Sequence, residues 1–214
     1  MKIGMLGSGD VGQSLGLGFV SLGHEVMMGS REPGKDEIKA WKAKAGAKAS
    51  AGTLAEAAAF GEMAVVATQW SGTENAIRLA GPARLAGKVV MDVTNPLLFR
   101  PNVPPDLAVS GRDSACEQIQ RWLPKSKVVK AFNSVSSLHM IKPSFPGGPP
   151  DMFICGSDAE AKTLIAGICR DFGWGVIDMG GIEAARFIEP LAMVYILHAI
   201  QTDCWDYAFK LLKK

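Results

Sequence analysis

The sequence predicts an α/β fold: a doubly wound, mainly parallel sheet with helices on both faces and a short C-terminal α/β and helical extension. Short apolar runs alternate with helix-like segments along most of the 214 residues, and strand–helix alternation of this kind folds with right-handed crossovers. The runs are continuous in apolar residues, which is typical of strands buried on both faces of a parallel sheet. The first run leads directly into a glycine-rich turn, residues 7–12, that opens a helix.

Each predicted strand is a short apolar run, and each predicted helix carries apolar residues at helical spacing. The predicted strands are Lys2–Leu6, Glu25–Met28, Met63–Thr68, Val89–Val93, Val128–Phe132, Met152–Cys155, Gly175–Asp178 and, with a weaker pattern, Ala47–Ala51. The predicted helices between them are Val11–Leu22, Lys35–Ala45, Leu54–Phe60, Thr73–Leu79, Ser114–Leu123 and Ala159–Phe172.

Two proline-rich stretches, Phe99–Arg112 and His139–Asp151, interrupt the alternation and are predicted to be loops. The second separates the last strand of the main sheet from a short tail in which strands and helices alternate. We therefore predict a main domain over residues 1–150 and a small extension over residues 151–214 that packs on it. A helical pattern after Pro190, from Leu191 to about Leu212, is expected to end the extension.

The composition is that of an ordinary globular protein, with 48% hydrophobic and 21% charged residues. A formal net charge of +2 offers no electrostatic basis for binding nucleic acid. The cysteines have neither C-x-x-C spacing nor clustered histidines, so we expect no metal site and no disulfide framework. The first residues lack a signal-peptide pattern, and the apolar stretch Leu191–Ile200 is too short to span a bilayer. We expect a cytoplasmic protein without a membrane partner.

Residues 7–12 have the sequence Gly-Ser-Gly-Asp-Val-Gly, which fits the G-x-G-x-x-G pattern between a strand and a helix. In that pattern Gly7 permits a tight turn, Gly9 lets the backbone approach a pyrophosphate, and Gly12 lets the helix pack against the strand. The helix N-terminus adds free N–H groups and a favourable dipole for phosphates. We infer a Rossmann-type dinucleotide site; the alternative is a glycine turn that serves packing only.

The end of the second strand indicates which dinucleotide binds. An NAD site usually carries Asp or Glu there, to accept a hydrogen bond from the ribose 2′-hydroxyl, but residues 25–28 are followed closely by Ser30 and Arg31. Ser30 can donate to a 2′-phosphate, and the Arg31 guanidinium can pair with that phosphate and stack on adenine. Lys35 adds a second positive charge, whereas Glu32 lies one position too far and precedes a proline. We therefore predict NADP(H); the alternative is a turn serine and a surface arginine.

Together these segments resemble the coenzyme F420-dependent NADP oxidoreductases, which pass a hydride between NADP(H) and a deazaflavin. Later segments are similar to the cytosolic reductase domain of the STEAP metalloreductases. The segments that carry the resemblance are residues 7–12, residues 29–31 with Lys35, and residues 129–133, 153–155, 177–180 and 184–189. The resemblance implies cofactor contacts from Gly7, Ser8, Gly9, Asp10, Val11, Gly12, Ser30, Arg31, Lys35, Thr68, Gln69, Trp70, Asn95, Pro96, Ala131 and Phe132.

Two departures from these families concern the second substrate. The deazaflavin enzymes carry a histidine near the position of Asn133, whereas the nearest histidine here is His139, in a proline-rich loop. The STEAP proteins continue into a membrane domain that carries haem, and no span is predicted in this chain. Asn133 and His139 remain as candidate catalytic residues; the alternatives are a residue that caps its strand and a surface histidine.

Hydride transfer between two flat rings needs little side-chain chemistry, because the cofactors carry the reaction and the protein positions them. Accordingly, no catalytic triad or carboxylate pair falls at the predicted strand ends. Asp92, inside a strand, is interpreted as a structural hydrogen-bond acceptor. Trp70 is expected either to wall the nicotinamide pocket or to anchor its loop in the core. Arg186 and Glu189, three positions apart on a predicted helix, are expected to pair; the resemblance implies a junction that holds the tail against the main sheet, and the alternative is a pair on the helix surface.

The sequence therefore predicts an NADP(H)-dependent oxidoreductase whose acceptor is a flavin or a deazaflavin of the F420 type. Two alternatives stay open: a reductase of a small metabolite, such as an imine reductase, and a non-enzymatic module that senses NADP(H). Apolar residues in the C-terminal helical region, among them Val194, Trp205 and Phe209, exceed what a lone exposed helix carries. They predict a homodimer.

Overall fold

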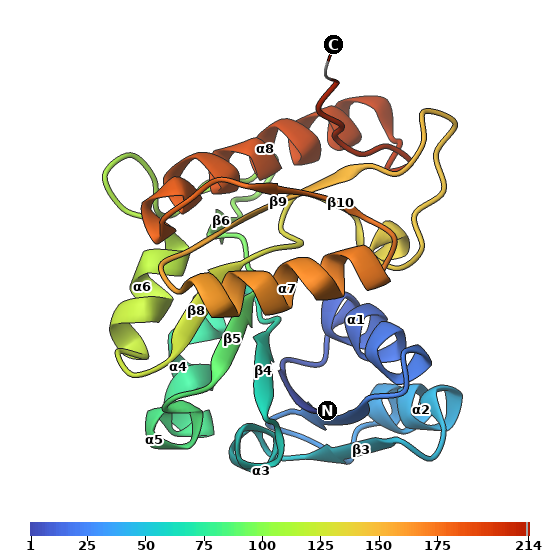
Figure 1. Ribbon diagram of the computed structural model, residues 1–214, viewed down its shortest axis with the longest axis vertical. Helices are drawn as coiled ribbons and strands as arrows, with labels where there is room; N and C mark the ends of the chain where they lie inside the picture. Colours follow the sequence, from blue (N-terminus) through green and yellow to red (C-terminus); the bar gives the residue numbers. More distant parts are fainter. Residues whose placement is uncertain (213) are drawn as a thin grey trace.

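The computed structural model describes residues 1–212 and 214, and over these residues one sheet of eight strands forms the centre of the molecule (Figure 1). Its strands are β1 (Lys2–Leu6), β2 (Glu25–Gly29), β3 (Ala49–Gly52), β4 (Met63–Val66), β5 (Val89–Asp92), β8 (Lys127–Lys130), β9 (Asp151–Gly156) and β10 (Gly175–Asp178). Their order across the sheet is β10-β9-β8-β5-β4-β1-β2-β3. Neighbours are parallel except β8 and β9, which pair antiparallel. The prediction of a doubly wound, mainly parallel sheet is confirmed.

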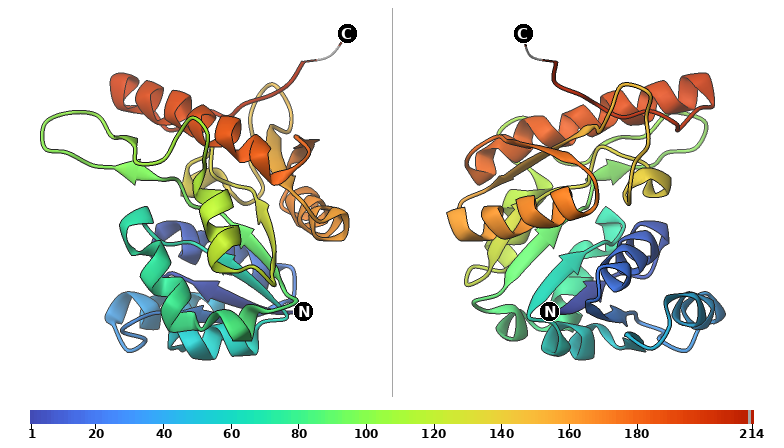
Figure 2. Two further views of the ribbon diagram at one scale, coloured as in Figure 1. Left: turned by 90° about the vertical axis from the view of Figure 1, so that its left-hand side faces the viewer. Right: turned by 45° about the vertical axis from the view of Figure 1, so that its right-hand side comes forward.

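Helices pack on both faces of this sheet (Figures 1 and 2). The helices whose buried side chains share one face are α1 (Asp10–Ser21), α2 (Asp36–Ala45) and α7 (Ala159–Asp171). Those on the other face are α3 (Leu54–Phe60), α4 (Trp70–Ala80), α5 (Pro82–Leu85), α6 (Ala115–Trp122) and α8 (Ala185–Thr202). Short 3-10 helices lie in the connections, η1 (Ser137–His139) and η2 (Ile182–Ala184).

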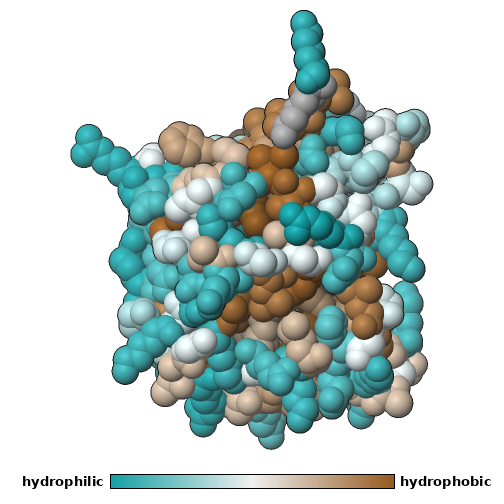
Figure 3. All heavy atoms as spheres, in the orientation of Figure 1, coloured by the Kyte–Doolittle hydropathy of each residue, from teal (hydrophilic) through white to brown (hydrophobic). Residues whose placement is uncertain are grey.

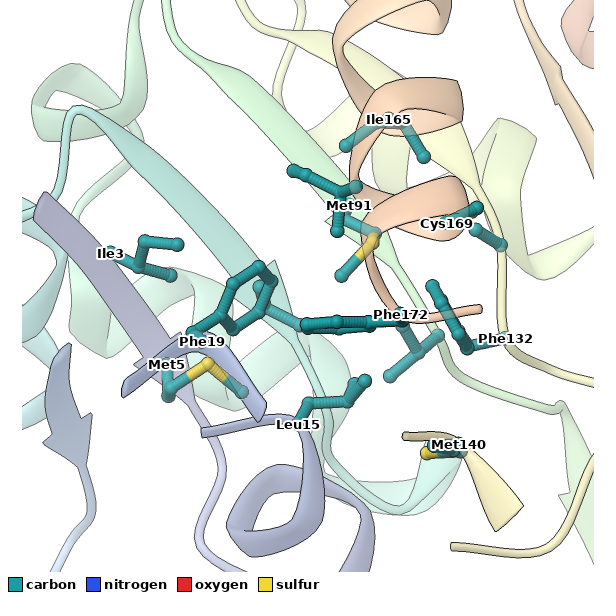
Figure 4. Packing of buried hydrophobic residues seen from close by; sticks show 14 of the residues in the cluster. Ile3, Met5, Leu15, Phe19, Met91, Phe132, Met140, Ile165, Cys169 and Phe172 are labelled. Atoms are coloured by element: carbon teal, nitrogen blue, oxygen red, sulfur yellow. The ribbon is translucent and has the colours of Figure 1, made fainter. Parts of the chain in front are cut away.

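A run of aromatic side chains joins the C-terminal part of the chain to the first face of the sheet (Figure 4). Phe19 of α1 packs against Phe172, which follows α7, with ring centroids 5.1 Å apart. Phe172 in turn meets Phe132 at 5.9 Å, and Phe132 meets Trp174 edge-on at 6.1 Å. All four rings are buried, and a fully buried side chain of this size contributes about 1.5–3 kcal/mol to stability. The C-terminal part therefore shares a core with the main sheet.

The prediction for the last helix is wrong at both ends. α8 begins at Ala185, before Pro190, and ends at Thr202. A proline inside a helix removes one backbone hydrogen bond, which is why the sequence suggested a start after it. Buried contacts in the first turn outweigh this loss, because the side chains of Ile188 and Glu189 are almost completely enclosed.

The chain after α8, residues 203–212, is not helical and is tied to β9. The Asp151 N–H donates to the Phe209 carbonyl at 2.9 Å, and the Asp151 carboxylate accepts a hydrogen bond from the Leu211 N–H at 2.8 Å. Trp205 and Phe209 therefore lie outside the helix in which they were expected. Long-range hydrogen bonds, which a local apolar pattern does not reveal, decide the path of this segment.

The predicted pair of Arg186 and Glu189 is also wrong. Arg186 Nε donates to Glu117 Oε2 of α6 at 2.9 Å, whereas Glu189 turns inward to Lys130 and to the N-terminus of α6. A pair of this spacing on a helix contributes only about 0.2–0.5 kcal/mol, so partners on other elements prevail. Both residues nevertheless hold α8 against the rest of the molecule, as expected for this segment.

Part of the stretch that was predicted to be a loop forms a hairpin. β6 (Leu97–Leu98) and β7 (Asp106–Leu107) pair antiparallel, and their connection projects from the body of the molecule (Figure 2). Arg100 and Asp106 form an ion pair at 3.1 Å across it. The division between residues 1–150 and 151–214 stays a prediction, since β9 and β10 extend the same sheet.

Candidate functional site

A cavity of about 840 Å³ opens at the carboxyl ends of the central strands. The strand order reverses between β1 and β4, and open α/β sheets bind ligands in the crevice at this point. The volume is typical of small-molecule sites. The predicted residues that line the cavity are Gly7, Ser8, Gly9, Asp10, Val11, Ser30, Arg31, Lys35, Thr68, Gln69, Trp70 and Asn95.

The glycines of the turn after β1 meet different requirements. Gly7 has φ 125°, and a Cβ there would lie 2.3 Å from the Ala67 carbonyl oxygen, so no side chain fits. A Cβ at Gly12 would lie 2.4 Å from the Gly7 carbonyl oxygen, so Gly12 permits the close approach of α1. A Cβ at Gly9 would meet nothing within 4 Å. The protein itself does not require glycine at position 9, whereas a ligand lying against the start of α1 would.

The helices that start at the cavity present uncapped N-termini. α1 begins after Gly9 and α4 after Gln69, and no side chain of the described residues caps either helix. Three other helices, α3, α6 and α7, are capped by Thr53, Ser114 and Asp158, whereas α2, α5 and α8 have no side-chain cap either. The uncapped N–H groups and the helix dipoles of α1 and α4 favour an anion in the cavity.

The loop after β2 forms one end of the cavity. The Ser30 hydroxyl accepts hydrogen bonds from the Glu32 N–H at 3.1 Å and from Ser8 Oγ at 3.5 Å. Because the Ser30 oxygen accepts a hydrogen bond from the Glu32 N–H, its own proton can be donated to a ligand. Arg31, Glu32 and Lys35 line the same end, which therefore carries two positive charges and one negative charge. This end of the cavity suits a phosphate dianion and is called the phosphate end below.

A smaller apolar pocket of about 210 Å³ adjoins the phosphate end. It shares Ser30, Arg31 and Leu54 with the larger cavity and adds Ala55 of α3 and Leu79 of α4. The Arg31 guanidinium is planar, and such a group stacks on flat rings. The two pockets together fit a nucleotide whose base and phosphate lie on either side of Arg31.

Trp70 both lines the cavity and is anchored in the core, so its contact with the nicotinamide stays a prediction. Its ring lines the cavity and also stacks on Trp122 of α6, with centroids 5.6 Å apart and planes inclined by 23°. The loop before it is held by hydroxyl groups: Thr68 Oγ1 and Thr73 Oγ1 lie 2.8 Å apart, and Thr73 Oγ1 donates to the Gln69 carbonyl at 3.1 Å. This wall of the cavity is therefore held in place by the protein's own contacts.

The loop after β5 is held by a buried charged group. Thr94 lines the cavity; its N–H and hydroxyl donate to Asp92 Oδ1 at 2.9 and 2.8 Å, and its carbonyl accepts from Lys130 Nζ at 2.7 Å. Lys130 also pairs with Asp92 Oδ2 and with Glu189. Burial by itself lowers the pKa of Lys130, but the two carboxylates outweigh it and raise that pKa above its usual value. The interpretation of Asp92 as a structural acceptor is confirmed.

Asn95 and Asn133 join the loops after β5 and β8. Asn95 Nδ2 donates to the Asn133 carbonyl at 2.7 Å, and Asn133 Nδ2 donates to Asn95 Oδ1 at 3.2 Å and to the Ile188 carbonyl at 3.0 Å. Asn95 lines the cavity, whereas Asn133 is buried and is not among the lining residues. Asn133 therefore anchors a residue of the cavity wall.

Four predicted cofactor contacts fall outside the cavity wall: Gly12, Pro96, Ala131 and Phe132. Gly12 serves the packing of α1, as described above. Pro96, Ala131 and Phe132 are buried, and the Phe132 ring belongs to the aromatic core. The side chain of Phe132 does not make the implied contact, because its ring packs against Phe172 and Trp174, which follow α7.

The candidate catalytic residues are not brought to the cavity either. His139 lies on η1, where its Nε2 hydrogen-bonds Asp206 Oδ1 at 2.8 Å and its ring packs against Phe145. It is not among the residues that line the cavity, and neither is Asn133. Any part that these two residues have in the reaction is therefore indirect.

Part of the cavity wall was not predicted from the sequence. α4 starts at Trp70, three residues earlier than expected, so its first two turns reach the cavity. A predicted start at Trp70 would have identified the residues of α4 that line the cavity. The sequence carries no local signal for the hairpin after β5, which lines it as well. The lining residues that were missed are Gly29, Glu32, Leu54, Ala67, Ser71, Gly72, Asn75, Ala76, Val93, Thr94, Leu97 and Phe99.

Other chemistry is not indicated by the part of the chain that the structure describes. Burial raises the pKa of the Cys116 thiol and raises the pKa of Cys169 to about 12, so both thiols stay protonated at neutral pH. No group of three His, Cys, Asp or Glu side chains in residues 1–212 and 214 is arranged to hold a metal ion. Over the same residues, the helices are too short or too polar to cross a membrane.

Comparison with known proteins places the chain in a family. Residues 2–96 match the family described as "NADP oxidoreductase coenzyme F420-dependent". The chain is 30% identical over 207 residues to the F420-dependent NADP reductase of Methanocaldococcus jannaschii, which covers 92% of this chain and 91% of that protein. It is 32% identical over 199 residues to metalloreductase STEAP3 of Rattus norvegicus, covering 90% of this chain. The chain spans only 36% of the length of that second relative.

The solved structure of a similar protein has the same fold as this chain. A protein from Arthrobacter sp. FB24, provisionally described as an F420-dependent NADP reductase, superposes with a TM-score of 0.94 and 35% identity, and the match covers 100% of both chains. The Rossmann-type fold is thereby confirmed. One end of the cavity is lined by Ser30, Arg31 and Lys35 and suits a phosphate, and a relative is matched over nearly its full length. The chain belongs to the coenzyme F420-dependent NADP oxidoreductase family and is an NADP(H)-dependent oxidoreductase.

Proposed function

We propose that this protein transfers a hydride between NADPH and a flat acceptor, a deazaflavin of the F420 type or, alternatively, a flavin. The observation that carries the proposal is one cavity that reaches from Ser30 and Arg31 to the loop after β5. The strands before these loops are three spacings apart in the order β2-β1-β4-β5, or about 14 Å at ~4.8 Å each. An extended dinucleotide fits with its adenosine end at β2 and its nicotinamide at β5.

The adenosine end is assigned from the charges of the cavity wall. Ser30 donates a hydrogen bond to the 2′-phosphate, and Arg31 and Lys35 neutralise its charge. The pyrophosphate lies at the start of α1, where Gly9 leaves room for it. The full set of proposed cofactor contacts is Gly7, Ser8, Gly9, Asp10, Val11, Ser30, Arg31, Lys35, Thr68, Gln69, Trp70 and Asn95.

At the other end the chain positions the two rings. NADPH supplies the hydride when it is bound, and Trp70 together with residues 93–95 borders its nicotinamide. Leu97 and Phe99 continue the wall outward, where the ring of the acceptor stacks. Transfer requires the donor and acceptor atoms to lie about 3–3.5 Å apart in an aligned geometry. No acid or base of the chain is needed, because the proton that a reduced deazaflavin gains comes from solvent.

The test is the oxidation of NADPH with an F420-type deazaflavin, FMN, FAD and riboflavin offered in turn, followed by the loss of NADPH absorbance and repeated with NADH. We expect turnover with the deazaflavin or with one of the flavins, and a higher kcat/KM with NADPH than with NADH. Binding of NADPH without turnover of any acceptor would refute the proposal. It would favour a small-metabolite substrate or a sensing role instead.

We also propose that α8 forms a homodimer interface. Its outward side exposes Phe187, Val194, Leu197 and Ile200, with Phe187 73% exposed. Figure 3 shows hydrophobic residues gathered in the upper part of one face of the molecule, near the C-terminus. Apolar surface of this kind marks interaction sites, and a second copy of the chain covers it in a two-fold arrangement. A cytoplasmic location and the absence of a nucleic-acid partner stay predictions from composition.

A further inference from the structure

Three charged side chains that do not line the cavity lie buried together beside it. Lys130 at the end of β8, Asp92 at the end of β5 and Glu189 of α8 are 0, 0 and 1% exposed. Lys130 Nζ lies 2.8 Å from Asp92 Oδ2 and 2.9 Å from Glu189 Oε1. Desolvating such ions is costly, and apolar residues of similar volume often replace them without loss of stability. Stability alone therefore does not account for the group.

Glu189 connects this group to two helices at once. Its Oε2 accepts a hydrogen bond from the Ala115 N–H at 2.9 Å, and its Oε1 accepts one from the Cys116 N–H at 3.0 Å. The carboxylate of α8 thus binds the N-terminus of α6 while it pairs with Lys130. Elements that are far apart in the sequence are fixed to one another at the ends of β5 and β8.

Thr94 is the residue through which the group reaches the cavity. Its N–H and hydroxyl donate to Asp92, and its carbonyl accepts from Lys130, so every polar atom of Thr94 is bound by the group. The next residue, Asn95, is held by Asn133, which also donates to a carbonyl of α8. α8 therefore holds two adjacent residues of the cavity wall by separate routes.

We propose that Lys130 is a positioning residue for hydride transfer: together with Asp92 and Glu189 it holds Thr94 where the nicotinamide ring is set. This inference rests on the proposed function, which assigns the loop after β5 to the nicotinamide end. Lys130 touches neither the cofactor nor the acceptor, and its effect passes through Thr94. A displacement of about 1 Å in such a wall costs about a hundredfold in rate. The affinity for NADPH, by contrast, comes mainly from the phosphate end at Ser30.

The test compares variants that differ in whether a charge is left unpaired. Lys130→Met leaves two buried carboxylates without their cation, which strongly destabilises a protein. A triple variant, Asp92→Asn with Lys130→Met and Glu189→Gln, keeps the shapes and leaves no buried charge. Arg186→Gln is the matched control, because it removes an ion pair between the same helices, α8 and α6, that does not reach Thr94.

In the folded triple variant we expect kcat to fall about a hundredfold, while the Kd for NADPH stays within about threefold of wild type. Arg186→Gln should change both constants by less than about twofold. If the group had only a structural role, its replacement would lower Tm but would not lower kcat while leaving the Kd for NADPH nearly unchanged. A folded triple variant whose kcat is within about threefold of wild type overturns the proposal, as does an equal loss of kcat in Arg186→Gln.

Measurements on the wild type distinguish a failure of the proposed function from a failure of the positioning role. If the wild type reduces none of the acceptors, the proposed function fails, and the positioning role is measured from the fluorescence of bound NADPH, which reports the surroundings of the nicotinamide ring. A changed emission in the triple variant, with wild-type emission in Arg186→Gln, supports the role of Lys130. An unchanged emission in the triple variant overturns it.

Discussion

Arg31 offers the most direct test of the phosphate end. Its side chain is exposed, and it lines both the large cavity and the adjoining apolar pocket. Arg31→Ala removes no hydrogen bond or ion pair that the described residues make, so the free energy of unfolding should stay within about 0.5 kcal/mol of wild type. Any change in cofactor binding then reports a lost contact with the ligand.

The size of that change follows from the exposure of the guanidinium. A hydrogen bond to a charged group contributes about 1.5–3 kcal/mol, and solvent screening at an exposed site favours the lower part, about 1.5–2 kcal/mol. NADPH also loses the stacking of Arg31 on adenine, about 0.5–1 kcal/mol, so the total loss is about 2–3 kcal/mol and its Kd should rise about 30- to 150-fold. NADH has no 2′-phosphate and loses only the stacking of Arg31 on adenine, about 0.5–1 kcal/mol, which is about a two- to fivefold rise.

The assay is a titration of NADPH and NADH into the wild type and Arg31→Ala, with Arg170→Ala, an exposed arginine of α7, as the matched control. Equal NADPH affinity in the wild type and Arg31→Ala would refute the role assigned to Arg31. An equal weakening of NADPH and NADH would mean that Arg31 contacts the adenine but not the phosphate.

Further substitutions test the other assignments. Gly9→Ala should leave Tm unchanged, because its Cβ meets nothing within 4 Å, yet raise the Kd for NADPH at least about tenfold by crowding the pyrophosphate; wild-type binding would contradict this. Gly7→Ala should lower the free energy of unfolding in denaturant by more than about 2 kcal/mol, because its Cβ would lie 2.3 Å from the Ala67 carbonyl oxygen. Glu32→Gln should lower the Kd for NADPH about two- to fivefold by removing a negative charge beside the phosphate. An unchanged or higher Kd would exclude that repulsion. Ile200→Asp should convert a dimer to a monomer in light scattering at micromolar protein, and a monomeric wild type would exclude the proposed interface.

Much of the site could be predicted from the sequence because its signals are local. A tight turn after a strand needs glycine whatever the rest of the chain does, so residues 7–12 identified both the turn and the start of α1. Ser30 and Arg31 come directly after the next strand, and parallel strands bring their carboxyl ends to one edge of the sheet. These residues line the cavity in the structure.

The opposite end of the cavity could not be predicted in this way. Lys130 meets Asp92 across 38 positions of sequence, and neither strand carries a signal that β5 and β8 are neighbours. Phe99 belongs to a hairpin whose place depends on how the loop after β5 leaves the sheet. Pro190 suggested a late start for α8, because helix propensity is a local quantity, but the burial of Glu189 outweighed it.

By itself, then, the sequence determined the strands, the glycine turn and the charged end of the cavity, since each depends on residues that are close along the chain. The tertiary structure alone decided which side chains support the nicotinamide end. Lys130, Asp92 and Glu189 lie on three separate elements, and their attraction acts only after the order of the strands has brought them together. The physical reason is that short-range Coulomb and hydrogen-bond energies depend on distance in space, not on distance along the chain.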